Sequence, residues 1–129
     1  MGRFVTAIVL TAALAASAHA QSFDCAKATS PAERLICVTP ILGDLDVTMT
    51  NLYRAALNAN PTRVAGIRRE QTAWWRRREA CADDAACIEE AEISRIAELK
   101  VLIGDSSPAP TLQPMGLPAI RGDGATRVG

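Results

Sequence analysis

The chain has 129 residues, of which 49% are hydrophobic and 22% are charged, with 14 basic and 14 acidic side chains. This length allows one ordinary domain and argues against a multidomain enzyme. The formal net charge of zero offers no general electrostatic case for nucleic-acid binding, which calls for a basic stripe or a high isoelectric point. Aromatic residues make up only 4% of the chain, so we expect a small core.

Residues 1–20 have the pattern of a secretory signal peptide. Arg3 supplies the positive charge, residues 4–16 form an apolar stretch, and Ala18-His19-Ala20 is an A-x-A cleavage site. The alternative is a membrane anchor, but this apolar stretch is shorter than the roughly 20 residues that cross a bilayer. We therefore predict cleavage before Gln21 and a periplasmic or secreted protein. No cysteine directly follows the cleavage site, so we expect no lipid anchor and no membrane insertion after cleavage.

Removal of this segment also removes His19, which is the single histidine of the chain. The 109 residues that follow contain no histidine, which excludes Ser-His-Asp and Cys-His catalysis and histidine zinc sites. A hydrolase based on two carboxyl groups is the remaining enzyme hypothesis, but no spacing in the chain marks such a pair. We therefore expect a protein that is not an enzyme and holds no cofactor.

The mature chain keeps four cysteines, at positions 25, 37, 81 and 87. An even number of cysteines in a small exported chain predicts two disulfides. A zinc site with four cysteine ligands is the alternative, but the spacings fit no familiar zinc knuckle, and we expect no metal. Three pairings are possible, and we favour the local one, Cys25–Cys37 with Cys81–Cys87.

Two helix starts follow one another in the first half of the chain. Ser30-Pro31-Ala32-Glu33 forms a capping box with proline at the first helical position, which predicts a short helix to about Cys37. Thr39-Pro40 is again an N-cap residue followed by proline. From there apolar residues recur at steps of three and four up to Asn60, which predicts a helix packed on a core. This apolar stripe consists of Leu42, Leu45, Met49, Leu52 and Ala56.

Asn60-Pro61 is expected to end the second helix and to cap a third, which runs to about Cys81. A disulfide between Cys81 and Cys87 requires a break after this helix, because six residues along an unbroken helix separate Cα atoms by roughly 9 Å. We place the break at Asp83-Asp84, where Asp84 caps a fourth helix that ends before Gly104. The inward-facing residues of the fourth helix are expected to be Ile88, Ala91, Ile96, Leu99 and Ile103.

The fold class that follows is all-α, a small disulfide-linked bundle of three to four helices. The helical domain spans residues 21–104. Residues 105–129 are rich in proline and glycine and poor in large apolar side chains, which predicts a disordered tail.

The positions assembled above resemble the LprI-type lysozyme inhibitor domain. The first half matches at Phe23-Asp24-Cys25-Ala26-Lys27-Ala28, Pro31, Glu33, Ile36-Cys37, Leu42, Leu45-Asp46 and Tyr53. The second half matches at Gln71-x-x-Trp74-x-x-x-Arg78-x-x-Cys81, Cys87, Arg95 and Leu99. The resemblance implies a small exported bacterial helical domain with four cysteines, and it implies lysozyme inhibition for the namesake rather than for every member.

Two positions depart from the family pattern. The namesake is similar to a lipoprotein, whereas this chain lacks the lipid-attachment cysteine. Position 92 is glutamate where the family often has an aromatic residue, and we expect this change to loosen the packing between the third and fourth helices.

The third helix carries two adjacent tryptophans. Gln71, Trp74 and Arg78 share a face, where Trp74 is expected to anchor the core while Gln71 and Arg78 bond to backbone carbonyls or a carboxylate. The alternative makes this face a partner-binding surface. Trp75 points about 100° away from Trp74, so one indole lies near the surface. We leave open whether Trp75 is a binding hot spot or packs under the first helix or the Cys25 loop.

Charge is divided between the third and fourth helices. The basic residues are Arg68, Arg69, Arg76, Arg77 and Arg78, and the acidic residues are Asp83, Asp84, Glu89, Glu90 and Glu92. The simple interpretation is solvated faces with interhelical ion pairs. The sharper one is that the acidic group meets a basic lysozyme. Because the arginines are matched by nearby acids, we expect no nucleic-acid binding.

The resulting hypothesis is an exported binding protein that inhibits a lysozyme by occluding its cleft or surface. A non-inhibitory interaction or structural module of the bacterial envelope is the alternative. The candidate partner-binding residues are Trp75, Asp83, Asp84, Glu89 and Glu90.

Overall fold

Four α-helices and one 3-10 turn make up residues 22–112, the part of the chain that the computed structural model describes. The elements are η1 (Cys25–Lys27), α1 (Pro31–Val38), α2 (Pro40–Ala59), α3 (Val64–Ala80) and α4 (Ala85–Ile103). No strand occurs within this range, so the all-α prediction is confirmed. The predicted signal peptide and residues 113–129 of the predicted tail lie outside the described residues.

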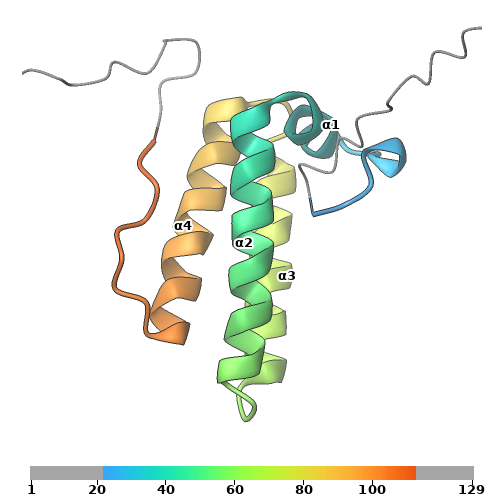
Figure 1. The fold of residues 1–129 in the computed structure, drawn as a ribbon. Coiled ribbons are helices and arrows are strands. Elements are labelled where there is room, and N and C mark those ends of the chain that lie inside the picture. The colour runs from blue at the N-terminus through green and yellow to red at the C-terminus, as the bar shows by residue number, and fades with distance from the viewer. Residues whose placement is uncertain (1–21, 113–129) are drawn as a thin grey trace, which may run out of the picture.

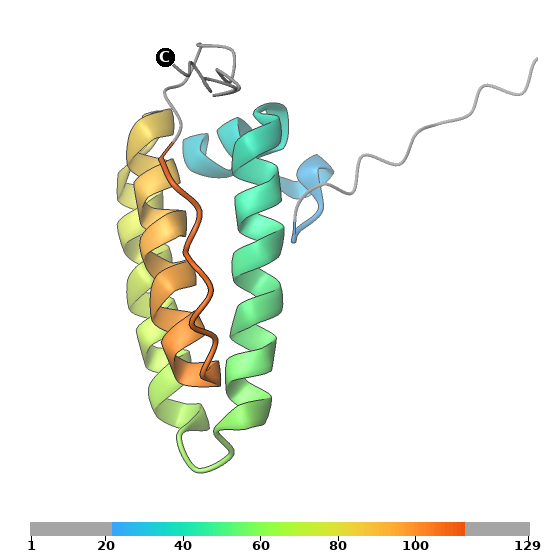
Figure 2. The ribbon, with the colours of Figure 1, turned by 60° about the vertical axis from the view of Figure 1, so that its left-hand side comes forward.

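The three long helices run side by side, and the short α1 lies across one end of them (Figure 1). The chain bends by 107° between α1 and α2, at Thr39. Within residues 22–112 no single helix has the length and hydropathy of a membrane span, although α1 and α2 pass that test as one bent pair. Figure 2 shows that residues 105–112 turn back and run along α4 in an extended conformation.

Local sequence signals set most of the helix ends. The Ser30 hydroxyl accepts from the Glu33 amide at 3.0 Å and the Glu33 carboxylate accepts from the Ser30 amide at 3.2 Å, which confirms the predicted capping box. Asp84 caps α4 by accepting from the Cys87 amide at 3.0 Å. Gly104 ends α4 with a φ of 73°, a left-handed conformation that glycine adopts without a steric penalty.

The junction between α2 and α3 differs from the prediction. The third helix begins at Val64 rather than at Pro61, and its N-cap residue is Arg63, so Asn60 does not cap it. The Asn60 side-chain amide instead donates to the carbonyls of Ala56 at 2.9 Å and Leu102 at 3.0 Å. The residue therefore ties the end of α2 to the end of α4, a contact between positions far apart in sequence.

The core consists of two clusters. The larger one fills the space between the long helices, and its buried members are Leu45, Met49, Ala56, Trp74, Ile96 and Leu99. The smaller one lies where α1 meets the long helices, and its buried members are Ala32, Ile36, Leu42 and Ile88. The predicted stripe of α2 is confirmed, with Leu52 half-buried.

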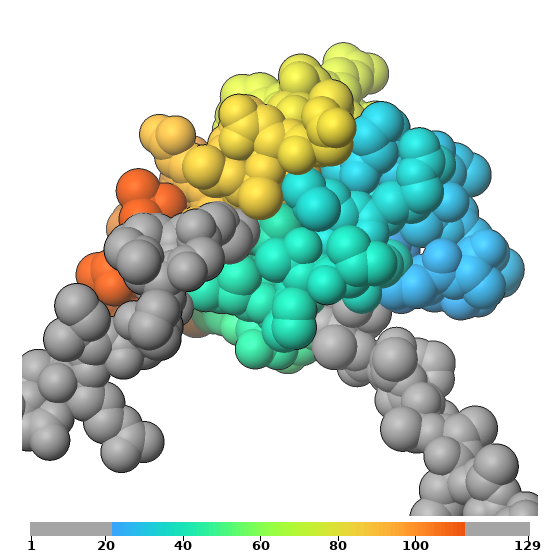
Figure 3. Space-filling model, turned by 90° about the horizontal axis from the view of Figure 1, so that it is seen from above, coloured from blue at the N-terminus to red at the C-terminus, as the bar shows by residue number. Residues whose placement is uncertain are grey.

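Both disulfides lie at the α1 end of the molecule and have the predicted local pairing. Cys25–Cys37 joins η1 to α1, and Cys81–Cys87 closes the turn between α3 and α4. The turn breaks the helix at residues 81–84, as the pairing requires. Cys81 packs against the smaller core cluster, and Figure 3 shows α1 and the α3–α4 turn side by side at this end.

The start of the predicted tail is held against α4. The Lys100 ammonium donates to the carbonyls of Ser107 at 3.2 Å and Pro108 at 3.1 Å, and to the Ser107 hydroxyl at 2.7 Å. Pro110 and Thr111 lie beside residues of α2 and α4. Residues 105–112 thus form no helix, in line with their composition, but they follow a defined path.

Candidate partner-binding surfaces

A buried arginine joins the three long helices. Arg78 of α3 donates from one terminal nitrogen to Asp46 of α2 at 3.1 Å and to Glu92 of α4 at 3.3 Å. Its other terminal nitrogen donates to Glu79 at 3.1 Å, and its guanidinium lies 5.1 Å from the ring centre of Trp74. Asp46 also accepts from the Ser22 amide at 2.7 Å. Arg78 therefore bonds to carboxylates, as the sequence predicts, and its role is structural.

Glu92 is the carboxyl group most affected by this burial. Removal from water raises its pKa from 4.5 to about 8, and the nearby charge of Asp46 acts in the same direction against the opposing effect of Arg78. Its second oxygen, Oε2, is buried and has no hydrogen-bond partner among the described residues. Near neutral pH, protonated Glu92 lowers the electrostatic cost of placing two carboxyl groups beside one guanidinium.

The burial of Asp46 and Glu92 was not predicted from the sequence. Both are charged residues that lie on apolar helix faces. Asp46 lies between Leu42 and Met49 at steps of four and three, and Glu92 lies four residues from Ile88. Their spacing marked them as core-facing positions, although their residue types are typical of the surface. Glu92 bonds to Arg78 across the interface between α3 and α4.

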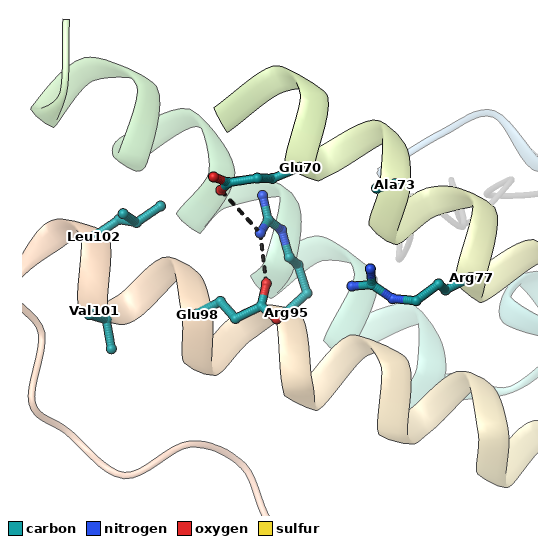
Figure 4. Close-up of a pocket in the computed structure, with 7 residues that line it drawn as sticks. All are labelled: Glu70, Ala73, Arg77, Arg95, Glu98, Val101 and Leu102. Atoms are coloured by element: carbon teal, nitrogen blue, oxygen red, sulfur yellow. Dashed lines mark hydrogen bonds and ion pairs between the residues drawn. The ribbon is translucent and has the colours of Figure 1, made fainter. Parts of the chain in front are cut away.

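A second buried arginine, Arg95, lies closer to the opposite end of α3 and α4. It donates to the Gln71 side chain at 3.0 Å and to the Glu98 carboxylate at 2.7 Å, and its ion pair with Glu70 spans 3.9 Å (Figure 4). The Gln71 side chain also donates to the Met49 sulfur at 3.1 Å. Gln71 is therefore held inside the bundle, and its polar atoms are used for structure.

The two adjacent tryptophans diverge, as the helix geometry requires. Trp74 is 2% exposed and donates from its indole nitrogen to the Ala91 carbonyl at 2.8 Å, so it is the predicted core anchor. Trp75 is 45% exposed. It lines a groove of about 400 Å³ between α2 and α3, together with Tyr53, Arg68, Gln71 and Thr72.

The acidic surface of the structure contains fewer residues than the sequence predicts. Glu89 is only 2% exposed and Glu92 is fully buried, so neither presents its carboxylate on an outer face. Asp83, Asp84 and Glu90 are exposed, as predicted. Glu89 and Glu92 are buried because α4 packs against both α2 and α3. These contacts cover more of the circumference of α4 than a single apolar stripe would.

The remaining acidic candidates are not brought together with Trp75. Asp83 lines a hollow of about 460 Å³ at the α1 end, shared with Pro31, Arg34, Leu35 and Val38. Glu89 lines a different hollow, beside Pro110 and Thr111. The candidate residues therefore belong to separate surfaces, and Asp84 serves as a helix cap in addition.

Two other motif positions have structural roles. The Asp24 side chain accepts from the Ala26 amide at 3.0 Å and so caps η1. Tyr53 packs against the larger core cluster and lines the groove beside Trp75.

The structure defines a class, which is a small all-α protein linked by two disulfides and built around buried arginine–carboxylate contacts. Among residues 22–112, no group of three or more histidine, cysteine, aspartate or glutamate side chains could hold a metal ion. No family model and no solved structure matches the chain.

The chain is similar to curated relatives named Lipoprotein LprI from Mycobacterium bovis and from two strains of Mycobacterium tuberculosis. Each is 30% identical over 122 residues, a match that covers 87% of this chain and 61% of the relative. The chain thus spans about three fifths of the length of the curated relatives it matches. These relatives confirm the resemblance found in the sequence.

Proposed function

We propose that this chain is an exported envelope protein, cleaved before Gln21, that binds a lysozyme and blocks its cleft or surface. The resemblance to the LprI-type domain supports this proposal, as do the relatives of that name. The observation that carries it is the hollow at the α1 end, where Val38 is 75% exposed beside Asp83. Both disulfides stiffen the segments around this hollow, so little conformational freedom is lost on binding.

The charges of this hollow suit the proposed target. Lysozymes cleave glycans with two carboxyl groups in a cleft, so a carboxylate is a poor group to place against that pair. Arg34 lines the hollow and provides a positive group for the catalytic carboxyls. Asp83 lies on the same surface, where it faces the basic rim of the enzyme and steers the encounter.

The test is the lysis of a bacterial cell-wall suspension by several lysozymes, with increasing amounts of the purified mature protein. We expect slower lysis with at least one lysozyme at micromolar protein. Unchanged lysis with every lysozyme at tens of micromolar would contradict the proposal. Faster lysis would instead favour a carboxylate-based hydrolase.

Variants at the hollow locate the contact. Val38→Ser and Asp83→Lys are expected to weaken inhibition by about tenfold or more, the effect of losing a central interface contact. Val101→Ser is the matched control, because Val101 is 78% exposed near the other end of α4. Asp84→Asn removes a charge but keeps an effective N-cap residue. Any loss of inhibition in this variant would therefore come from the charge and not from a weakened helix cap. Equal losses in the Val38 and Val101 variants would place the contact elsewhere.

A non-inhibitory interaction module of the envelope is the second candidate. The observation that favours it is that Trp75, Asp83 and Glu89 line three separate hollows rather than one face that could occlude a cleft. Binding of a lysozyme without slower lysis, measured by calorimetry beside the lysis assay, would support this candidate over inhibition.

A further inference from the structure

We propose that the groove between α2 and α3 binds an acidic saccharide, a pyranose that carries a carboxylate. The inference is independent of lysozyme binding, since the groove and the α1-end hollow are lined by different residues. The groove has a volume of about 400 Å³, which suits one or two sugar rings. Its walls are Tyr53 of α2 and a set of α3 residues that recur at steps of three and four.

Three groups in the groove are available to a ligand. Trp75 is 45% exposed, and within residues 22–112 neither the Tyr53 hydroxyl nor the Arg68 guanidinium makes a hydrogen bond or ion pair. The side chains of the other two lining residues already make hydrogen bonds within the protein. Gln71 bonds to Arg95 and Met49, and the Thr72 hydroxyl donates to the Arg68 carbonyl at 3.1 Å. A ligand therefore meets one open aromatic face, one hydroxyl and one cation.

The charge around the groove calls for a negative ligand. Arg68 is one of four exposed arginines of α3 for which no ion pair is recorded in the described part of the chain. The acidic residues of α3 are engaged elsewhere, since Glu70 pairs with Arg63 and Arg95 and Glu79 pairs with Arg78. No acidic residue lines the groove beside Arg68, so this part of α3 presents a positive charge to a ligand. The four exposed arginines are Arg68, Arg69, Arg76 and Arg77.

The chemistry of an acidic pyranose matches these groups one by one. The apolar C–H face of the ring packs on an indole face, as for other amphipathic contacts of tryptophan. A ring hydroxyl bonds to the Tyr53 hydroxyl. The carboxylate pairs with Arg68, whose planar guanidinium can donate two parallel hydrogen bonds. A protein partner would need about 800 Å² of surface on each side, which a groove of this size does not define.

The experiment is calorimetric titration of the purified protein with trigalacturonate, in which every ring carries a carboxylate. We expect binding in the micromolar to millimolar range that weakens at high salt, because screening reduces the charge attraction. Maltotriose, a neutral trisaccharide, is expected to bind at least tenfold more weakly. A short polyglutamate and a single-stranded oligonucleotide test for general polyanion binding and nucleic-acid binding.

Variants of the same helix locate the site. Trp75→Ala and Arg68→Gln are each expected to weaken trigalacturonate binding tenfold or more. Arg77→Gln is the matched control, because Arg77 is an exposed arginine of α3 that lines the separate hollow beside Arg95 and Glu98 (Figure 4). It is expected to change the affinity by less than threefold. Circular dichroism spectra and melting curves check that each variant is folded.

Several outcomes would overturn the proposal. These are no heat of binding at millimolar trigalacturonate, equal affinity for maltotriose, or equal losses in the Arg68 and Arg77 variants. Tighter binding of polyglutamate or the oligonucleotide would assign the basic face of α3 to another class of ligand.

Discussion

The core between the long helices and the α1 end of the molecule are held together by different means. Between the long helices, the larger core cluster surrounds Trp74, and Arg78 bonds to buried carboxyls of α2 and α4. At the α1 end, an eight-residue helix rests on a cluster of four buried side chains and is linked covalently. Isolated helices shorter than about 12 residues are marginal in water. Covalent links therefore replace packing where a short helix cannot bury enough apolar surface.

The largest effect is expected from breaking the buried arginine network. Arg78→Ala leaves Asp46 and Glu92 buried without a cation, which we expect to cost about 3–5 kcal/mol of unfolding free energy. Arg77→Ala is the control, because Arg77 is the adjacent exposed arginine, and its cost is expected to stay within about 0.5 kcal/mol. Urea unfolding followed by circular dichroism measures both. Equal stability of the two variants would show that the network contributes nothing.

The pH dependence of stability tests the same region without breaking it. Because the folded-state pKa of Glu92 is about 8 and its ordinary value is 4.5, the folded protein holds a proton that the unfolded chain has lost between these values. This group therefore makes stability fall as the pH rises from about 5 to about 8, by up to about 1.4 kcal/mol per pH unit, and then level off.

Glu92→Gln removes this titration and is expected to flatten the dependence of the unfolding free energy on pH. The stability of the variant relative to the parent protein is therefore expected to rise as the pH approaches 8. Glu90→Gln, at an exposed position on the same helix, is the control and is expected to leave the profile unchanged. Urea unfolding at pH 5, 6.5 and 8 provides the measurement. Parallel profiles for the parent protein and the Glu92 variant would contradict the assignment.

Removing a disulfide tests what stabilises the α1 end. The double substitution Cys25→Ser and Cys37→Ser is expected to cost about 3 kcal/mol, and the equivalent change at Cys81 and Cys87 about 2 kcal/mol, since the shorter loop restricts the unfolded chain less. Hydrogen exchange followed by NMR is expected to show faster exchange in α1 while amides between the long helices stay protected. A uniform loss of protection would mean that α1 and the long helices unfold as one unit.

The smallest effect is expected at the helix caps of the α1 end. Ser30→Ala removes the hydroxyl of the capping box and is expected to cost about 1 kcal/mol. Thr39→Ala is the matched control, because Thr39 precedes α2 but makes no capping bond with its side chain. Its cost is expected to be below about 0.5 kcal/mol. Thermal melts of the two variants, recorded together, would show the reverse order if the predicted cap at Thr39 were the important one.

Short-range signals account for what the sequence predicted well. The capping box at Ser30, the cap at Asp84 and the glycine at 104 each act within a few residues, so no knowledge of the fold is needed to find them. The local disulfide pairing was the favoured one of three, and it is consistent with the helix break that the sequence offers at Asp83 and Asp84. The divergence of Trp74 and Trp75 followed from helix geometry alone.

The candidate surface was predicted less well, because it depends on which residues the helices cover. Trp75 and Asp83 are exposed as candidates should be, whereas Glu89 lies in the interior. The groove that Trp75 shares with Tyr53 brings together two helices, and no spacing along one helix could reveal it. The same holds for the hollow that joins Val38 to Asp83 across 45 positions of sequence.

The sequence by itself determined the helices, their order and their ends at Ser30 and Gly104, because each is decided by neighbours along the chain. It favoured the local disulfide pairing among three possible ones, and the structure has that pairing. Only the tertiary structure decided which charges are buried. Asp46, Glu92 and Arg95 have residue types of the surface, and they lie inside because the long helices pack against one another and bring Arg78 to the two carboxyls and Glu98 to Arg95. That burial removes acids from the outer surface, whereas four arginines of α3 stay exposed. The charge that this protein presents to a partner therefore follows from packing.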